Sequence, residues 1–348
     1  MESRRRTADL SQAMGCRIVF PAKGQVQLET FSAAQPRADE LTVSTRYSLM
    51  SIGTETTILH ARYDLGTHFA ARFSFPQLKT GVQSIAVVTT VGSAVSDFKP
   101  GDRVFMRMAH TSEWTLPAAL CSPVPLDVDA KQACWCGLAK TAFRAAYAAP
   151  FTLGGNVLIV GAGPVGQMAV RWARSAGVQT IAVTDLAPLR LRLADAGGAT
   201  HLVAGSIASV GDELRAICGR DGFDIVVDST GNPAVFAEAL SATAMFGKLV
   251  LLGDTGYPSR QSLTSDVMTK GLTITATHDH HDRGGWTQRR IDALFFQLVQ
   301  RGVFPLDGLN THEFSPAACV EAYELATERR DEALGILFDW TTLQGATP

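Results

Sequence analysis

Three closely spaced glycines, Gly161, Gly163 and Gly166, separate a short apolar run from a helical pattern. The run Val157–Val160 is typical of a buried strand, and Val165–Ser175 has the periodicity of a helix. Gly161 permits a tight turn, Gly163 lets a pyrophosphate approach the backbone, and Gly166 lets helix and strand pack closely. A structural glycine-rich turn is the alternative. The position between strand and helix favours a dinucleotide site instead.

An acidic residue, Asp185, follows the glycines by about 20 residues, at the end of the apolar run Thr180–Thr184. A carboxylate at this place accepts hydrogen bonds from the adenosine ribose and repels a 2′-phosphate, so it favours NAD over NADP. Arg190 could weaken that preference with its positive charge, and a helix N-cap is the alternative role of Asp185. Pro164 and Val165 complete the predicted site as the first residues of the helix, whose N-terminus can bind phosphates.

The elements around this site divide the sequence into a mostly β first part and an α/β middle part. Strand and helix patterns alternate after Asn156, which is typical of a doubly wound parallel sheet. Two later helices and a final strand-like run, Gly335–Trp340, are expected to return to the first part and create a cleft. The expected elements after the first helix of the middle part are Thr180–Thr184, Leu189–Ala196, Ile225–Val227, Ala234–Thr243, Lys248–Leu252, Thr273–Thr277, Ile291–Arg301 and Pro316–Arg329.

Composition excludes several classes of partner. The 348 residues carry a net charge of −2, so no basic face for nucleic acid is expected. The apolar runs are too short to span a bilayer. The N-terminus lacks the apolar stretch of a secretory signal, and the six cysteines are scattered as reduced thiols would be. These features predict a cytoplasmic protein that acts on a small molecule and binds neither nucleic acid nor membrane.

Four segments in order and spacing resemble the medium-chain dehydrogenase/reductase superfamily over about residues 16–340. The resemblance implies a GroES-like catalytic domain (16–150), a Rossmann domain (151–286), and a C-terminal return to the catalytic domain (287–348), in a homodimer or homotetramer. It also adds Thr230 and Gly253 to the cofactor site. The four segments are Gly81–Val104, the Rossmann motif running on to Thr200, Phe223–Gly231 and Gly247–Gly253.

The sequence departs from the zinc-dependent members of this superfamily. Ile52 stands where they have a cysteine ligand, and Val82 and Gln83 replace a histidine and a glutamate. The third ligand would fall near Gly137, and its neighbour Cys136 cannot hold zinc alone. The cysteine-rich lobe of a structural zinc is also missing. We therefore expect no bound metal.

The run from Ser51 to Glu55 resembles a zinc-less Ser-x-Gly-Thr-Glu pattern. Enzymes akin to the bacteriochlorophyllide hydroxyethyl dehydrogenase and to sugar or cyclitol dehydrogenases carry this pattern. Without zinc, a side chain must exchange the proton during hydride transfer. The resemblance places Lys140 and Thr141 on a helix that lines the nicotinamide pocket, with Thr141 at the carboxamide.

Four side chains are candidates for the proton exchange. Lys140 is the first candidate, because burial would lower the pKa of its amine, and Glu55 is its expected charged neighbour. The alternative is that the Lys140 side chain extends to solvent. Thr54 matches a proton-relaying hydroxyl and has backbone capping as its alternative. Glu55 could instead pair structurally with an arginine. His278 begins a histidine-rich run that ends a strand, and a plain polar loop is the alternative there.

Three functions remain open on this reading. The first is a zinc-independent oxidoreductase that transfers a hydride between NAD(H) and a secondary alcohol or ketone, with polyols, sugars and cyclitols as candidate substrates. The second is a quinone or enoyl reductase that uses NAD(P)H, which Asp185 disfavours when the cofactor carries a 2′-phosphate. The third is a non-catalytic nucleotide-binding protein.

Overall fold

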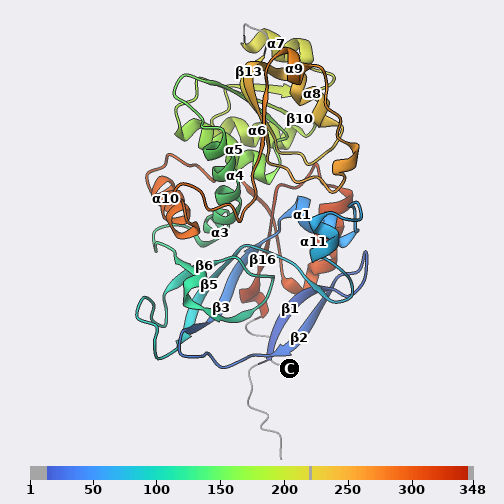
Figure 1. Cartoon of the computed structure of the whole chain (residues 1–348). Helices are drawn as coiled ribbons and strands as arrows, with labels where there is room; N and C mark the ends of the chain where they lie inside the picture. The colour runs from blue at the N-terminus through green and yellow to red at the C-terminus, as the bar shows by residue number, and fades with distance from the viewer. Residues whose placement is uncertain (1–13, 219–221, 344–348) are drawn as a thin grey trace, which may run out of the picture.

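The computed structural model describes residues 14–218 and 222–343, which form two domains side by side (Figure 1). One domain is rich in antiparallel sheet and holds the N-terminal half of the chain. The other is a parallel sheet with helices on both faces. This arrangement confirms the expected α/β class with a sheet-rich catalytic domain and a Rossmann domain.

The Rossmann domain is built on six parallel strands in the order β11-β10-β9-β12-β13-β14. The order reverses direction between β10 and β12, on either side of β9, and ligands of such sheets bind at that switch point. The central strands are in regular register: Ile159 on β9 pairs with Val183 on β10 and with Val227 on β12. Its elements are β9 (Asn156–Val160), α5 (Pro164–Ser175), β10 (Thr180–Asp185), α6 (Pro188–Gly197), β11 (His201–Ala204), α7 (Gly211–Cys218), β12 (Phe223–Asp228), α8 (Val235–Ala242), β13 (Thr243–Leu251), α9 (Asp266–Thr269) and β14 (Thr273–Ala276).

The catalytic domain contains a seven-stranded sheet and a smaller three-stranded sheet. In the larger sheet, β3 pairs with β5, β7 and β16. In the smaller, β1 lies between β2 and β4. The elements are β1 (Met14–Phe20), β2 (Gln27–Ser32), β3 (Glu40–Leu49), α1 (Ile52–Leu59), α2 (His68–Arg72), β4 (Leu78–Lys79), β5 (Ser84–Val91), β6 (Arg103–Met106), β7 (Glu113–Pro117), β8 (Cys121–Pro123), α3 (Ala130–Ala133) and α4 (Cys136–Ala148).

The C-terminal segment lies partly in the catalytic sheet. Strand β16 (Gly335–Asp339) is antiparallel to β3, and β15 (Asn310–Phe314) extends the sheet beside it. Helix α11 (Cys319–Glu328) packs against α1, whereas α10 (Gln288–Gln300) packs against α4. The chain therefore crosses between the domains twice, once at α4 and once after β14.

Helix α4 joins the two domains through a shared apolar core. The indole Nε1 of Trp172 on α5 donates a 2.7 Å hydrogen bond to the carbonyl of Ala139 on α4. Phe143 packs edge-on against Trp172, which packs in the same way against Phe304. The segment 130–149 forms two helices, because α3, capped by the Asp129 side chain, ends before α4 begins. This break sets the direction of α4 along the cleft.

No helix among the described residues is long and apolar enough to cross a membrane.

Candidate functional site

The glycine turn between β9 and α5 has the geometry that a dinucleotide requires. Gly161 has φ +88°, a left-handed conformation that favours glycine. A Cβ on Gly166 would lie 2.0 Å from the Gly161 carbonyl oxygen, so no side chain fits there. A Cβ on Gly163 would meet nothing within 4 Å. The turn is thus closed toward the sheet and open at Gly163.

The open side of the turn is the N-terminus of α5. Gly163 is the N-cap and has no side chain to satisfy the first amides, and Pro164 begins the helix without an N–H. Val165 packs partly against the main core and fixes the first turn. Free amides at this end, with the helix dipole, can bind a pyrophosphate. The residues present therefore fit a dinucleotide.

Asp185 ends β10 and reaches back to the glycine turn. Its Oδ2 accepts a 2.7 Å hydrogen bond from Ala162 N, and its Oδ1 accepts a 2.8 Å bond from Ala187 N. These bonds fix the carboxylate at the rim of the cleft, with lone pairs left for a ribose. Arg190, by contrast, donates through Nη2 to the carbonyls of Arg330 and Ala333. Its guanidinium thus tethers α6 to the C-terminal segment.

Thr230 and Gly253 lie at the carboxyl ends of β12 and β13. Both the amide and the hydroxyl of Thr230 donate to Asp228 Oδ1, at 2.9 and 2.6 Å. Burial raises the pKa of the Asp228 carboxyl, although these bonds oppose that effect. A Cβ on Gly253 would lie 2.4 Å from Gly231 N, so the two loops touch through backbone alone. They form the second wall of the cofactor cleft, next to Gly161.

Arg330 was missed by the sequence reasoning and lies near Asp185. Its side chain is exposed, but the protein around it, with repulsion from Arg190, lowers its guanidinium pKa. Attraction by Asp185 opposes the shift, and Arg62 adds to it. Its Nη2 lies 3.5 Å from the position of a Cβ on Gly53, at the start of α1. Positive charge therefore gathers opposite the Asp185 carboxylate.

Lys140 is buried on α4 in a network of charges. Its Nζ lies 3.0 Å from Asp279 Oδ1 and donates to Gln288 Oε1 at 3.3 Å. Arg107 Nη1 lies 2.8 Å from the same Asp279 oxygen. Burial lowers the pKa of the Lys140 amine, as does Arg107, while Asp279 and Asp292 oppose the shift. The partner of Lys140 is Asp279, not the Glu55 that the sequence reasoning offered.

Thr141 and His278 are brought to the same network from two sides. Thr141 Oγ1 bonds to the Gly137 carbonyl at 3.1 Å and to Asp279 Oδ1 at 3.4 Å. His278 directly precedes Asp279, in the loop after β14. Burial lowers the pKa of the His278 imidazole, and the neighbouring His280 adds to this. Lys140 and Thr141 thus meet around the Asp279 carboxylate, whereas His278 is its neighbour along the chain.

Glu55 lies in a separate buried cluster. Its Oε2 accepts from Thr80 Oγ1 at 2.9 Å and from Tyr323 OH at 2.5 Å, and lies 3.2 Å from His110 Nε2. Ser51 N donates to the other oxygen at 2.6 Å. Burial alone would raise the pKa of this carboxyl, but His110 and the hydrogen bonds outweigh burial and lower it.

Thr54 and Glu55 face opposite ways on α1. The Thr54 side chain is exposed, whereas the Glu55 side chain is 2% exposed. The sequence suggested an arginine as a structural partner of Glu55. The structure has His110 in that role. His110 was missed because it lies in an irregular segment between β6 and β7.

Apolar and amide side chains occupy the positions of the zinc ligands in zinc-dependent relatives. Ile52 is 1% exposed and belongs to an apolar cluster with Met50 and Tyr323. Gln83 Oε1 accepts a 2.8 Å bond from Leu138 N and lies against Gly137. Burial, with the nearby Asp292, raises the pKa of the Cys136 thiol well above its usual value. These residues do not fit a zinc ion.

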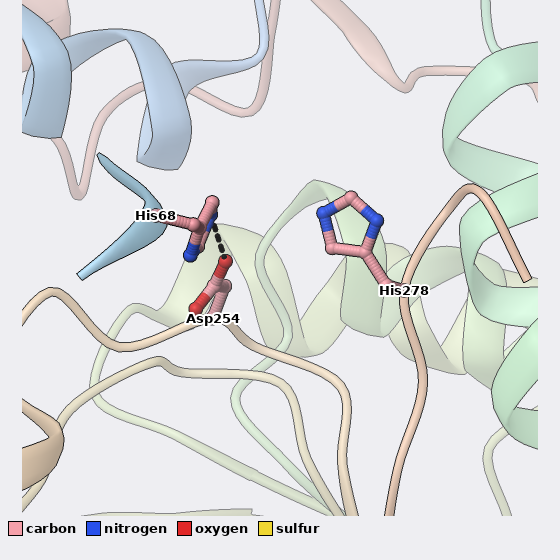
Figure 2. Close-up of side chains that lie close together, drawn as sticks. All are labelled: His68, Asp254 and His278. Carbon is pink, nitrogen blue, oxygen red and sulfur yellow. Dashed lines mark ion pairs between the residues drawn. The ribbon is translucent and has the colours of Figure 1, made fainter. Parts of the chain in front are cut away.

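A different set of side chains, which could hold a metal ion, lies close together elsewhere (Figure 2). His68 on α2 faces Asp254, which follows Gly253, and His278 lies beside them. His68 Nε2 is 3.0 Å from Asp254 Oδ2. Burial raises the pKa of the Asp254 carboxyl, and His68 opposes this. His68 and Asp254 were missed, although the position of Asp254 at the end of β13 was a usable signal.

Comparisons with known proteins match parts of the sequence to dehydrogenases. A family model described as zinc-binding dehydrogenase matches residues 164–286, which lie after every zinc-ligand position discussed above. The L-threonine 3-dehydrogenase of Paraburkholderia phymatum is 33% identical over 193 residues, 54% of this chain and 52% of that enzyme. The chain thus spans about half the length of the curated relative that it matches.

Solved structures share the fold of the whole described chain. A zinc-binding dehydrogenase from Sinorhizobium meliloti 1021 bound to NADP superposes with a TM-score of 0.80 and 19% identity, covering 94% of this chain and 100% of that chain. A short chain alcohol dehydrogenase from Escherichia coli CFT073 complexed with NADH gives a TM-score of 0.80 and 17% identity, covering 94% and 99%. At these identities the likeness shows the fold.

The sequence motifs, the two-domain fold and the relatives agree. These likenesses agree with the resemblance to the medium-chain dehydrogenase/reductase superfamily that the sequence motifs indicate.

Proposed function

We propose that this protein is an oxidoreductase that transfers a hydride between NAD(H) and a secondary alcohol or ketone without zinc. The observation that carries the proposal is the open turn at Gly163, with the free amides of α5 on one side and the fixed Asp185 carboxylate on the other. The bound dinucleotide would supply or accept the hydride. The protein would hold the cofactor and move the proton.

The preference for NAD follows from the neighbourhood of Asp185. The hydrogen bonds from Ala162 N and Ala187 N keep the carboxylate in place, so a 2′-phosphate would meet a fixed negative charge. The Nη2 of Arg190 already donates to two carbonyls of the C-terminal segment, which supports this preference because that donor is not free to bind a 2′-phosphate.

Lys140 is our candidate for proton exchange with the substrate. If the adenosine lies at Asp185, the dinucleotide crosses the glycine turn and its nicotinamide lies over the ends of β12 to β14. The loop after β14 carries Asp279, the ion-pair partner of Lys140. A buried amine whose pKa is lowered can give and take a proton near neutrality. Asp279 and Arg107 would position it, and Thr141 would bind the carboxamide.

The test measures cofactor binding and turnover in parallel. Quenching of tryptophan fluorescence by NADH and NADPH would compare the two affinities, and a panel of secondary alcohols and ketones would be assayed by the absorbance of reduced nicotinamide. We expect tighter binding of NADH and turnover of at least one polyol, sugar or cyclitol. Binding without turnover of any compound would support a non-catalytic nucleotide-binding protein instead.

One observation favours a second candidate, a quinone or enoyl reductase that uses NADPH. Three arginines lie at the adenosine end of the site. Arg330 is repelled by Arg190 and Arg62, and Asp185 attracts both Arg330 and Arg190. Such a group could neutralise a 2′-phosphate. Tighter binding of NADPH, with reduction of a quinone or an enone, would select this candidate.

We further propose a homodimer or homotetramer in the cytoplasm. Phe246 is 78% exposed and Met268 86% exposed, close to the edge strand β14, so an apolar patch lies where a second sheet could pair. Cys16, Cys121, Cys134, Cys136 and Cys319 are free thiols, as in a reducing compartment. Sedimentation equilibrium would measure the assembly, and a monomer at micromolar concentration would contradict the proposal.

A further inference from the structure

Three metal-binding side chains from three separate elements meet at the cleft between the domains. His68 begins α2 of the catalytic domain, Asp254 follows β13, and His278 follows β14. One ligand atom from each lies within 4.8 Å of the other two. Figure 2 shows the His278 ring across a gap from the paired His68 and Asp254 side chains. Within residues 14–218 and 222–343, this is the group of three His, Cys, Asp or Glu residues that is close enough to share an ion.

The donor set suits a divalent transition metal. Two imidazoles and one carboxylate are the ligands of many zinc, cobalt and nickel sites. A zinc ion about 2.0–2.1 Å from each of two nitrogens holds them about 3.4 Å apart. His68 Nε2 and Asp254 Oδ2 are already 3.0 Å apart, and both side chains are about half exposed (49% and 45%). Small side-chain rotations would therefore complete the site.

His278 can turn one ring nitrogen toward the pair. The amide of His280 lies 3.4 Å from His278 Nδ1, which is long for a hydrogen bond. A metal on Nε2 would place the ring proton on Nδ1 and release only that weak contact. His280 and His281 lie beside His278, with ring centroids 5.0 and 6.0 Å away. Four of the eight histidines of the chain are thus at this place.

The backbone around the three side chains is held by other contacts. Asp64 N, ahead of α2, donates a 2.7 Å hydrogen bond to Gly256 O, which joins the two domains next to His68 and Asp254. The loop of His278 is anchored by Asp279, which pairs with Arg107 and Lys140. The segments therefore stay together without an ion. Metal binding would then cost little conformational entropy of the backbone.

We propose that His68, Asp254 and His278 bind one divalent transition-metal cation across the cleft, and that this cation inhibits the enzyme. The site lies at the carboxyl ends of β13 and β14, where substrate must reach the nicotinamide. A cation held by both domains would also oppose their opening. The inhibition, though not the binding, rests on the proposed function.

The site differs from the zinc site of zinc-dependent relatives in position and in role. Those ligands would lie at Ile52, Val82 and near Gly137, where an apolar and amide lining leaves no donors for zinc. The cleft site would not polarise a substrate held by α4. The alternative is that His68 and Asp254 only pair with each other and bind no metal, and the test distinguishes the two.

The experiment titrates metal-free protein with Co²⁺, following its visible absorption, and with Zn²⁺ by calorimetry. We expect one equivalent to bind. His68→Ala and His278→Ala should each weaken binding by about tenfold or more. His201→Ala is the matched control, because His201 is exposed on β11, far along the sheet from β13 and β14. Melting temperatures would confirm that all three variants are folded.

Turnover with and without Zn²⁺ gives the second readout. Wild type and His201→Ala should be inhibited and should recover with chelator, whereas His68→Ala should resist inhibition. Absence of saturable binding, or equal binding by wild type and both site variants, would overturn the proposal. His68 and Asp254 would then be a pair that binds no metal. Normal metal binding without turnover of any substrate would sink the proposed function alone.

Discussion

The two sides of the cleft are built from different parts of the chain. The cofactor side consists of backbone: the Gly161 turn, the amides of α5 and the contact of Gly253 with Gly231. The side opposite consists of buried charged side chains, such as Lys140 with Asp279. Backbone geometry leaves few options for substitution, whereas a set of side chains can be exchanged. The chemistry of this fold can therefore change while its cofactor site stays.

The side-chain half holds two carboxylates in contrasting ways. Glu55 is enclosed by His110, Tyr323 and Thr80, and the net effect lowers its pKa. Asp279 is paired with cations at the rim of the cleft, and Arg107 and Lys140 lower its pKa against the effect of burial. We therefore expect Glu55 to stabilise its domain, and Asp279 to position Lys140 as the proposed function requires.

The largest effect is expected at Lys140. Lys140→Met removes the proposed proton-exchanging group, so turnover should fall by about 10²–10⁴-fold while NADH binds as before. The pH profile of the residual activity should lose the limb that reports this amine. Lys131→Met is the matched control, because Lys131 pairs with Glu313 at the surface. Wild-type turnover by Lys140→Met, with loss in His278→Ala, would transfer the role to the histidine.

The second effect concerns stability rather than turnover. Because the folded state lowers the pKa of Glu55, its contribution is present above the unfolded pKa of about 4.5 and is lost as pH falls through the folded value. Glu55→Gln leaves His110 without its charged partner and should cost about 3–5 kcal/mol at neutral pH. Urea unfolding at several pH values would measure this. An equal dependence on acid pH in variant and wild type would contradict the assignment.

A pair of alanine substitutions separates packing from cofactor binding on the backbone side. Gly166→Ala puts a Cβ against the Gly161 carbonyl and should lower the free energy of unfolding by about 1–3 kcal/mol. Gly163→Ala meets open space, so its apo melting temperature should match wild type while NADH binding weakens. If Gly163→Ala bound NADH as wild type does, the pyrophosphate would lie elsewhere.

The smallest effect is expected at the adenosine end. Asp185→Ser removes the acceptor for the ribose hydroxyls and the repulsion of a 2′-phosphate, so the NADH-to-NADPH affinity ratio should fall by about tenfold or more. Fluorescence titration with both cofactors measures the ratio. A wild-type protein that already prefers NADPH would contradict the NAD assignment and direct attention to Arg330.

The parts of the fold that the sequence predicted are those set by local pattern. Strands such as Thr180–Thr184 and the helix after Gly163 follow from periodicity and glycine chemistry, and the structure has them at nearly the expected residues. Strand β11 was missed because its four residues are mostly exposed and carry no alternation. Helix α1 was missed because its threonines have low helix propensity, which tertiary burial of Ile52 and Glu55 overrides.

The candidate site divides in the same way. Gly161, Gly166 and Asp185 could be predicted because one contiguous segment fixes their geometry. The pairing of Lys140 with Asp279 could not, because 139 positions of chain separate the partners and only the packing of α4 against the β14 loop joins them. His68 and Asp254 are likewise joined only by the contact between the domains.

Turnover after removal of metal tests the central claim most directly. The protein would be dialysed against chelator, its residual zinc measured by elemental analysis, and hydride transfer with NAD(H) followed on the best alcohol or ketone of the panel. We predict full activity with far less than one zinc per chain, since Ile52 and Gln83 leave no ligands at the usual position. Loss of activity on dialysis, restored by stoichiometric Zn²⁺, would contradict the account.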